Sequence, residues 1–436
     1  MTKVCKFGGT SMADKGTIEQ VINIIKSDDE RRFVVVSAPG KRYPNDQKIT
    51  DLLYKSFEEK DQETQPSFKK IRKRFIQLVE DLQVDIDIKK HLDEISQNIK
   101  SSKTSDYAAS RGEYLCALIV AKKMDWPFID AKDFIMFNSN GIFDGHATDL
   151  MIKEKLLKYE RGIIGGFYGS MPDGQIKTFS RGGSDITGSI VAMGVNASVY
   201  ENWTDVNGFM TANPQIIKNP KPIDILTFEE LRELSYMGAS VLHPESLYPL
   251  RKSSIPVNIR NTFEPENKGT TIINQKTNFS DRLVTGIAGK ASYVSIVISK
   301  SLMNNEKGFA RRVLSILEKH DISMEHLPTG IDTMSVVIEK NELKNRISVK
   351  ELIEEIRSVV NPDDIYATED LAMIAIVGQG MANKIGTAAR VFNALYKYQI
   401  NVRMIDQGSS EMNIIVGVSE KDLNLSIHAL YEEFFQ

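Results

Sequence analysis

Two glycine-rich segments of the chain carry charged side chains at spacings that suit the binding of an anion. The first is KFGGTS at residues 6–11, in which Lys6 stands just before Gly8 and Gly9 at the end of an apolar run. Glycines directly after a strand allow backbone N–H groups to approach an anion closely, and Lys6 places a positive charge beside them. Turns of this kind also occur as plain structure, so this segment alone leaves both interpretations open.

The second segment is SRGGSD at residues 180–185, directly before a stretch of helical composition. Arg181 offers a planar guanidinium group that suits a carboxylate or a phosphate. We expect Ser184 to cap the helix and Asp185 to lie in its first turn, where the helix dipole favours a negative charge. The alternative is an ordinary capped glycine turn without a ligand.

Together the two segments hold the parts that phosphoryl transfer requires. Lys6 and the glycines could cradle and neutralise a phosphate, and Asp185 could orient Lys6 or hold a magnesium-bound phosphate. A carboxylate acceptor is already ionised at neutral pH, so it needs no strong general base. The six histidines show no metal or dyad spacing, and the chain has neither a GxxxxGK[ST] loop nor the HRD and DFG segments of protein kinases. We therefore predict no metal site made by protein side chains alone.

These segments need a scaffold that brings strand ends together, and the pattern of apolar residues predicts one. Strand-like and helix-like stretches alternate along the first part of the chain. The predicted strands cover residues 3–7, 33–36, 162–167 and 256–259, and the predicted helices cover residues 149–160 and 184–193 and begin again at Thr227. Such alternation indicates an α/β fold, a mostly parallel sheet with helices on both faces. Residues 62–103 are charged and free of glycine, which predicts a helical insertion.

An internal repeat occupies the last third of the chain. GFARRVL at residues 308–314 corresponds to GTAARVF at residues 386–392, and the same shift of 78 positions pairs Gly330 with Gly408. Each copy resembles a ferredoxin-like βαββαβ module. The predicted domains are residues 1–282 with both glycine segments, residues 283–362 with the first copy and residues 363–436 with the second.

Composition places the chain among ordinary globular proteins. Of its 436 residues, 41% are hydrophobic and 26% are charged, and the length predicts two or three domains. A formal net charge of -3 gives no reason to expect a nucleic acid or an anionic membrane as partner. The two cysteines, Cys5 and Cys116, cannot form a disulfide framework. Without an apolar signal segment or a run of about 18 apolar residues, we expect a cytoplasmic protein.

Seven segments together resemble the monofunctional aspartokinases, a family of the amino-acid kinase superfamily. The segments are KFGGTS (6–11), VVVSA (34–38), RGE (111–113), SRGGSD (180–185), WTDV (203–206), GASVLHP (238–244) and QGSSE (407–411). The resemblance covers nearly the whole chain and implies an αβα kinase domain followed by two ACT domains. It implies an enzyme that transfers a phosphoryl group from ATP, with Mg²⁺, to the side-chain carboxylate of L-aspartate. This would be the first step toward lysine, threonine and methionine.

The resemblance also implies roles for individual residues. Lys6 would neutralise the transferred phosphoryl group, with Asp185 as its orienting partner. Arg181 would grip a carboxylate of aspartate, and Glu113 would receive its ammonium group. Further implied substrate contacts are Ser37, Thr50, Gly182, Gly183 and Ser184. The implied ATP contacts, besides Lys6, are Gly8, Gly9, Thr10, Ser11, Thr204, Asp205, Met210, Gln215 and Ser240. Relatives often carry an aromatic residue, an arginine and a lysine at the last three of these positions.

In the repeat, the resemblance implies a site for an amino-acid effector. The predicted lining residues of the first copy are Met303, Asn305, Gly308, Phe309, Ser323, Met324 and Glu325. Pairing two modules side by side would cover their sheet edges and create pockets where a carboxylate meets backbone N–H groups. We therefore expect a homodimer or larger assembly that lysine, threonine or both inhibit. The alternative is a pair of modules that only joins subunits.

Two other functions stay open on the sequence. Glutamate and acetylglutamate kinases share the glycine turns but usually lack the RGGSD loop together with tandem ACT modules. A non-catalytic amino-acid sensor could keep the fold, although Lys6, Glu113, Arg181 and Asp185 argue for an enzyme.

Overall fold

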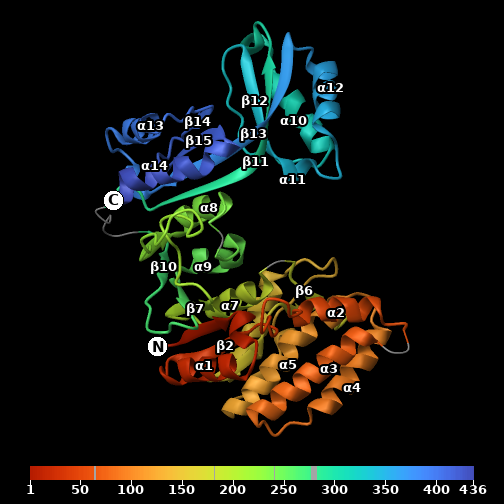
Figure 1. The fold of residues 1–436 in the computed structure, drawn as a ribbon. Helices are drawn as coiled ribbons and strands as arrows, with labels where there is room; N and C mark the ends of the chain where they lie inside the picture. Colours follow the sequence, from red (N-terminus) through yellow and green to blue (C-terminus); the bar gives the residue numbers. More distant parts are fainter. Residues whose placement is uncertain (63–64, 181, 240, 276–281) are drawn as a thin grey trace. The chain divides into compact units, whose positions relative to one another are not determined.

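The computed structural model describes residues 1–62, 65–180, 182–239, 241–275 and 282–436. These residues form two compact units (Figure 1). The first comprises Met1–Phe209, Pro222–Phe228 and Val241–Lys276, and the second comprises Met210–Lys221, Glu229–Ser240 and Thr277–Gln436. A single boundary at residue 282, as predicted, does not describe this division, because two earlier segments fold with the second unit.

The first unit is built on an eight-stranded sheet in the order β3-β4-β2-β1-β7-β9-β10-β8. All neighbouring pairs in it are parallel except β9 and β10. Its strands are β1 (Lys3–Phe7), β2 (Arg31–Val36), β3 (Phe128–Ile129), β4 (Gly162–Gly165), β7 (Val199–Thr204), β8 (Ile225–Thr227), β9 (Val257–Asn261) and β10 (Thr270–Ile273). A separate two-stranded sheet pairs β5 (Tyr168–Ser170) with β6 (Ile176–Thr178). The predicted α/β fold with a mostly parallel sheet is confirmed.

Helices cover both faces of the large sheet. Successive side chains of a strand point to opposite faces, so Cys5 and Phe7 pack into a core with α1 and α5, whereas Lys6 between them meets α7. The helices of the unit are α1 (Lys15–Lys26), α2 (Ile49–Glu58), α3 (Pro66–Leu82), α4 (Ile88–Ser101), α5 (Asp106–Met124), α6 (Gly145–Glu154), α7 (Gly183–Gly194) and α9 (Tyr248–Ser253). Short 3₁₀ turns are η1 (Thr10–Met12), η2 (Ala131–Asp133), η3 (Leu156–Lys158) and η4 (Pro244–Leu247).

The stretch predicted as a helical insertion contains α3 and α4. These helices lie beside α2 and α5 in one layer, drawn in orange in Figure 1. Ile71, Phe75 and Leu92 on them are buried in the same core as Cys5 and Phe7. The insertion therefore enlarges the hydrophobic core of the first unit, because its apolar face packs inward. Arg74 on α3 is buried as well, whereas the other charged side chains of α3 and α4 lie at or near the surface.

The second unit contains one antiparallel sheet in the order β12-β11-β13-β15-β14. Its strands are β11 (Gly286–Ser299), β12 (Thr333–Glu339), β13 (Asp364–Val377), β14 (Met404–Asp406) and β15 (Asn413–Ser419). Its helices are α8 (Phe228–Tyr236), α10 (Phe309–Lys319), α11 (Lys340–Leu343), α12 (Val349–Val360), α13 (Thr387–Lys397) and α14 (Leu423–Phe435), with 3₁₀ turns η5 (Met303–Asn305), η6 (Gln379–Met381) and η7 (Glu420–Asp422). Only Phe228 of α8 belongs to the first unit.

The predicted repeat is confirmed by matching elements. Helices α10 and α13, and the long strands β11 and β13, each lie 78 positions apart. Gly308 and Gly386 precede the two helices with left-handed φ angles of 76° and 88°, a conformation that glycine adopts without the cost of a Cβ. The 3.6-residue periodicity of the two segments thus predicts both helices, and the glycines mark where they begin.

The two repeats share strands instead of following one another as separate modules. The first half of β11 packs in the core of the second repeat, where Ile287 lies with Ile374 and Leu430. The second half packs in the core of the first repeat, where Ile296 lies with Val313 and Ile365. Figure 1 shows β11 as one long strand that enters both halves of this unit. A boundary between residues 362 and 363, as predicted, therefore assigns the start of β11 to the wrong core.

Candidate active site

The centre of the candidate site is an ion pair between Lys6 and Asp185. Lys6 lies on β1 at the middle of the sheet, and Asp185 lies in the first turn of α7. Lys6 Nζ is 2.7 Å from Asp185 Oδ1, and both side chains are largely buried. A buried ammonium group requires a partner that compensates its lost hydration. The two side chains are thus in contact, and the role of Asp185 in orienting Lys6 stays a prediction.

Asn202 is a third member of the centre that the sequence prediction missed. It stands on β7 directly beside Lys6 in the parallel register, and its Nδ2 donates to Asp185 Oδ1 at 2.8 Å. The Tyr200 hydroxyl donates to the backbone carbonyl of Asp185 at 3.2 Å. Asp185 is therefore held from two positions on one strand. A polar residue inside an otherwise buried strand was the signal for Asn202, and it carried no information about its partner.

The first glycine segment forms the turn directly after β1. Gly8 N–H donates to the Trp203 carbonyl at 3.0 Å, and a Cβ on Gly8 would lie 3.6 Å from Lys6 Nζ. Gly8 and Gly9 are half-buried and Thr10 is exposed. The hydroxyl of Ser11 is buried and lies 2.7 Å from the Thr262 hydroxyl. Ser11 thus anchors the turn through its buried hydroxyl group. The two glycines and Thr10 are more accessible, and Gly8 lies next to the Lys6 ammonium group.

The second glycine segment begins helix α7. Arg181 lies outside the described residues, and Gly182 is the N-cap with a left-handed φ of 59°. The prediction that Ser184 caps the helix is wrong, because Ser184 lies inside the first turn and packs against Gly166, where a Cβ would come within 2.8 Å of it. A Cβ on Gly183 would lie 2.4 Å from Phe167 Cδ2. Close packing at these glycines therefore positions the first turn of α7 and, with it, Asp185.

Glu113 is a buried carboxyl group with an unused acceptor. It lies on α5, it is 4% exposed, and its Oε2 has no hydrogen-bond partner among the described residues. Burial raises the pKa of Glu113 to about 8, and a hydrogen bond with the Ala38 backbone opposes this rise. Ala38 follows Ser37 at the end of β2, and Gly112 packs against Ile49 at the start of α2. Ala38 and Ile49 thus contact this part of α5. Ser37, which directly precedes Ala38 in the sequence, and Thr50, which directly follows Ile49, are both half-buried.

The predicted ATP contacts fall into three groups. Thr204 and Asp205 lie at the end of β7, where the Thr204 hydroxyl donates to Asp205 Oδ1 at 3.2 Å and the Asp205 side chain is exposed. Met210 and Gln215 belong to the second unit, so their contact with a nucleotide stays a prediction. Ser240 lies outside the described residues.

The predicted effector residues all lie in the second unit. Met303 and Phe309 are buried in the core of the first repeat. Gly308 caps α10, and Asn305, Ser323 and Met324 are exposed. Glu325 Oε2 is buried without a hydrogen-bond partner among the described residues. Burial, followed by a hydrogen bond with Glu325, raises the pKa of Tyr236 on α8 above its ordinary value.

Within the described ranges, no group of three or more His, Cys, Asp or Glu side chains is placed to hold a metal ion. A search of the same residues finds no helix with the length and hydropathy needed to cross a membrane.

Known proteins resemble this chain over its whole length. Residues 1–261 match the model of the amino acid kinase family, and residues 374–434 match that of an ACT domain. Aspartokinase 3 of Bacillus subtilis is 37% identical, with 99% of this chain and 98% of the relative covered. The crystal structure of Clostridium acetobutylicum aspartate kinase matches at a TM-score of 0.92 with 46% identity and 99% of both chains covered. Escherichia coli aspartokinase III, solved with lysine and aspartate, matches at a TM-score of 0.79 with 26% identity over 100% of both chains, and it has also been solved with aspartate and ADP.

Proposed function

The chain belongs to the amino acid kinase family and, within it, to the aspartokinases, and from this premise we propose how its residues perform and regulate aspartate phosphorylation. The enzyme is an aspartate kinase, and its second substrate is a nucleotide. The observation that carries the proposal is the Lys6–Asp185 pair, which Asn202 holds beside the glycine turn at the end of β1.

We propose that Lys6 stabilises the negative charge of the phosphoryl group in flight. The Gly8–Gly9 turn follows directly after Lys6 on the chain, so backbone N–H groups and the ammonium group can act on the same phosphates. Asp185 keeps Lys6 in place, and the acceptor carboxylate of aspartate attacks without a general base. Mg²⁺ would be held by the nucleotide phosphates and at most one or two carboxylates.

We propose that Glu113 recognises the ammonium group of aspartate. Its Oε2 is buried and has no hydrogen-bond partner in the part of the chain that the structure describes, and a cation placed beside it would compensate the energetic cost of burying a carboxylate. Arg181 would hold a carboxylate of the substrate, and the hydroxyls of Ser37, Thr50 and Ser184 would complete the pocket together with Gly182 and Gly183. This arrangement selects a zwitterion over a simple dicarboxylate.

A coupled assay of ADP release tests both roles. With aspartate as substrate, Lys6→Met should reduce turnover about 100-fold or more, because it removes a charge directed at the transition state. Lys158→Gln, a change of an exposed lysine of the same unit, is the matched control. Succinate, which lacks the ammonium group, should be a poor substrate of the unmodified enzyme. Normal turnover of a folded Lys6→Met variant would refute the role of Lys6, and efficient use of succinate would refute that of Glu113.

We further propose that lysine, threonine or both inhibit the enzyme through the first repeat. Glu325 Oε2, which has no hydrogen-bond partner among the residues described, suits the ammonium group of an amino acid, and the Glu325 side chain forms a hydrogen bond with Tyr236 of α8. Helix α8 begins directly after β8 of the catalytic sheet, so a shift of α8 is transmitted along the chain. The supporting relative is the aspartokinase III that was solved with lysine. We also propose that this unit joins the subunits of a homodimer or larger assembly, and that the product leads toward lysine, threonine and methionine.

The regulatory proposal is tested on the full chain, because the segments 210–221 and 229–240 fold with the second unit and a truncated chain would expose them. Glu325→Gln should raise the inhibitory concentration of the effector at least tenfold without changing turnover in its absence. Glu318→Gln, the same change at an exposed position of α10, should leave inhibition unaltered. If neither lysine nor threonine, alone or together, inhibits the unmodified enzyme, the regulatory proposal fails while the catalytic one stands.

A further inference from the structure

Arg111 is a buried arginine for which the described part of the chain provides no ion pair. Among the described residues of the first unit, three arginines are more than nine-tenths buried, namely Arg31, Arg74 and Arg111. Arg31 forms an ion pair with Glu201 at 2.8 Å, and Arg74 forms one with Asp46 at 3.5 Å. Of the residues that the structure describes, none provides Arg111 with an ion pair. Its Nε and Nη2 donate to the neighbouring Ser110 hydroxyl at 3.1 and 3.0 Å.

Three tyrosine rings surround this guanidinium group. The rings of Tyr107, Tyr114 and Tyr168 lie 4.7, 4.6 and 5.2 Å from its central carbon. Hydrogen bonds to other residues hold two of these tyrosines in place. Asn98 donates to the Tyr107 hydroxyl at 3.0 Å, and the Tyr168 hydroxyl donates to Asp130 at 2.8 Å. Aromatic faces partly compensate a desolvated cation, but they leave its N–H groups free to bind an anion. The rings therefore hold the guanidinium group in one orientation.

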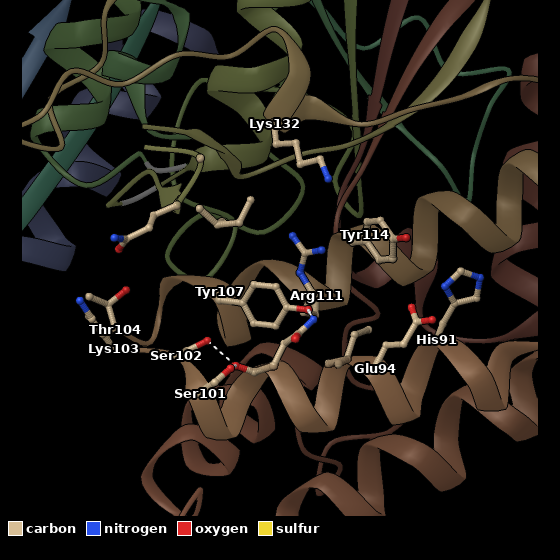
Figure 2. A pocket seen from close by; sticks show the side chains of 15 residues that line it. His91, Glu94, Ser101, Ser102, Lys103, Thr104, Tyr107, Arg111, Tyr114 and Lys132 are labelled. Carbon is tan, nitrogen blue, oxygen red and sulfur yellow. Dashed lines mark hydrogen bonds between the residues drawn. The ribbon is translucent and has the colours of Figure 1, made fainter. Parts of the chain in front are cut away.

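Arg111 points into a cavity of about 520 Å³ between α4, α5 and the β5–β6 hairpin. Figure 2 shows its guanidinium group and the Lys132 ammonium group directed toward one another across this space. Lys103 and His91 also line the cavity, and Glu94 is the carboxylate among its lining residues. Lys132 Nζ also forms an ion pair with Asp130 Oδ2 at 3.6 Å, and Asp130 is not a lining residue. Positive charge thus predominates on the wall, and the volume is that of a site for a small organic molecule.

Glu113 is not among the lining residues of this cavity, and the charge of Arg111 is the smallest of the influences that oppose the raised pKa of Glu113. Residues two positions apart on a helix point in directions about 200° apart, so Arg111 and Glu113 project from opposite sides of α5. The RGE segment therefore serves two faces, and the sequence resemblance assigns a role only to its last residue.

We propose that the cavity between α4, α5 and the β5–β6 hairpin binds a small organic oxyanion, whose carboxylate or phosphate group pairs with Arg111 and Lys132. The planar fork of Arg111 suits two coplanar oxygens, and Lys132 provides a second positive charge from the opposite wall. The proposal does not depend on the roles assigned to the catalytic residues.

The test uses the full chain with inorganic phosphate and, separately, with citrate, both at constant ionic strength. Both tryptophans, Trp126 and Trp203, lie in the first unit, so their fluorescence reports its thermal unfolding as anion is added. We expect at least one of the two anions to raise the midpoint temperature of unfolding of the first unit, with an effect that saturates as the anion concentration increases. Saturation with phosphate alone would indicate a phosphorylated ligand, and saturation with citrate alone would indicate a carboxylate.

Variants assign the response to this cavity. Arg111→Lys keeps the charge but loses the fork, and Lys132→Met removes an exposed ammonium group at the opposite wall. Each should raise the half-saturating concentration at least tenfold, whereas Lys6→Met and Lys158→Gln should leave it unchanged. The proposal is overturned if neither anion gives a saturable response, if Lys132→Met responds like the unmodified chain, or if Lys6→Met alone abolishes the response.

Discussion

Glu113→Gln should remove a pH dependence that the unmodified enzyme shows in its affinity for aspartate. The Glu113 carboxyl group is buried, and its pKa is raised to about 8 in the absence of substrate. If its carboxylate form binds the substrate ammonium group, aspartate must displace a proton from Glu113 at neutral pH. The affinity for aspartate then increases as the pH rises toward 8, because a growing fraction of the enzyme is already ionised.

The size of the effect follows from the shift of this pKa. At pH 7 only about a tenth of the enzyme carries an ionised Glu113, so binding should release about 0.9 proton per aspartate. The Michaelis constant for aspartate should fall roughly 10- to 50-fold between pH 6 and pH 8. The shift from 4.5 to about 8 corresponds to about 5 kcal/mol of unfavourable free energy for the buried carboxylate without a cation.

The same shift has a consequence for stability with a defined sign. The folded state binds the Glu113 proton more tightly than the unfolded state, so this contribution to stability is complete below about pH 4.5 and is lost as the pH rises to about 8. Glu113→Gln cannot lose a proton, so its stability relative to the unmodified chain should increase over this range. Tryptophan fluorescence during urea unfolding measures this difference in the first unit, since both tryptophans lie there.

Calorimetric titration of aspartate in buffers of different ionisation enthalpy measures the released protons directly. The matched control is Glu80→Gln, which removes an exposed carboxylate on α3 of the same unit. The reasoning is refuted if aspartate binding releases no proton at pH 7 and its Michaelis constant is the same at pH 6 and pH 8. It is also refuted if Glu113→Gln binds aspartate as tightly as the unmodified enzyme at pH 8.

Two further substitutions test how the centre is positioned. Asn202→Leu removes one hydrogen bond to Asp185 and should reduce turnover about 10-fold while leaving the aspartate Michaelis constant unchanged; a change confined to the Michaelis constant would contradict a positioning role for Asn202. Gly183→Ala would place a Cβ 2.4 Å from the Phe167 ring and should lower the stability of the first unit by roughly 1–3 kcal/mol. Gly16→Ala at the start of α1 is its control, because a Cβ there would lie 3.6 Å from Asp14 Oδ1, an ordinary van der Waals contact. Equal stability of both variants would refute the packing argument.

Local patterns in the sequence were sufficient to predict several helices and strands of the sheet and the repeat, and the glycine turn beside Lys6. Alternation of apolar stretches predicted the parallel sheet, and glycine directly after β1 predicted the turn beside Lys6. The shift of 78 positions predicted the repeat, because matched helices need matched apolar faces and matched starting glycines. Each of these properties depends on residues that are neighbours along the chain, so one sequence contains all the information required.

Contacts between distant residues could be decided only by the tertiary structure. Serine is a residue type that often caps helices, but packing against Gly166 places Ser184 inside the first turn of α7. The pKa of Glu113 and the burial of the Arg111 charge depend on which atoms exclude water from each group, and many of those atoms come from other strands and helices. Strand β11 serves two cores because its halves pair with partners far away in the sequence. Burial and pairing depend on the whole chain, since the cost of removing a charge from water is set by every group that surrounds it.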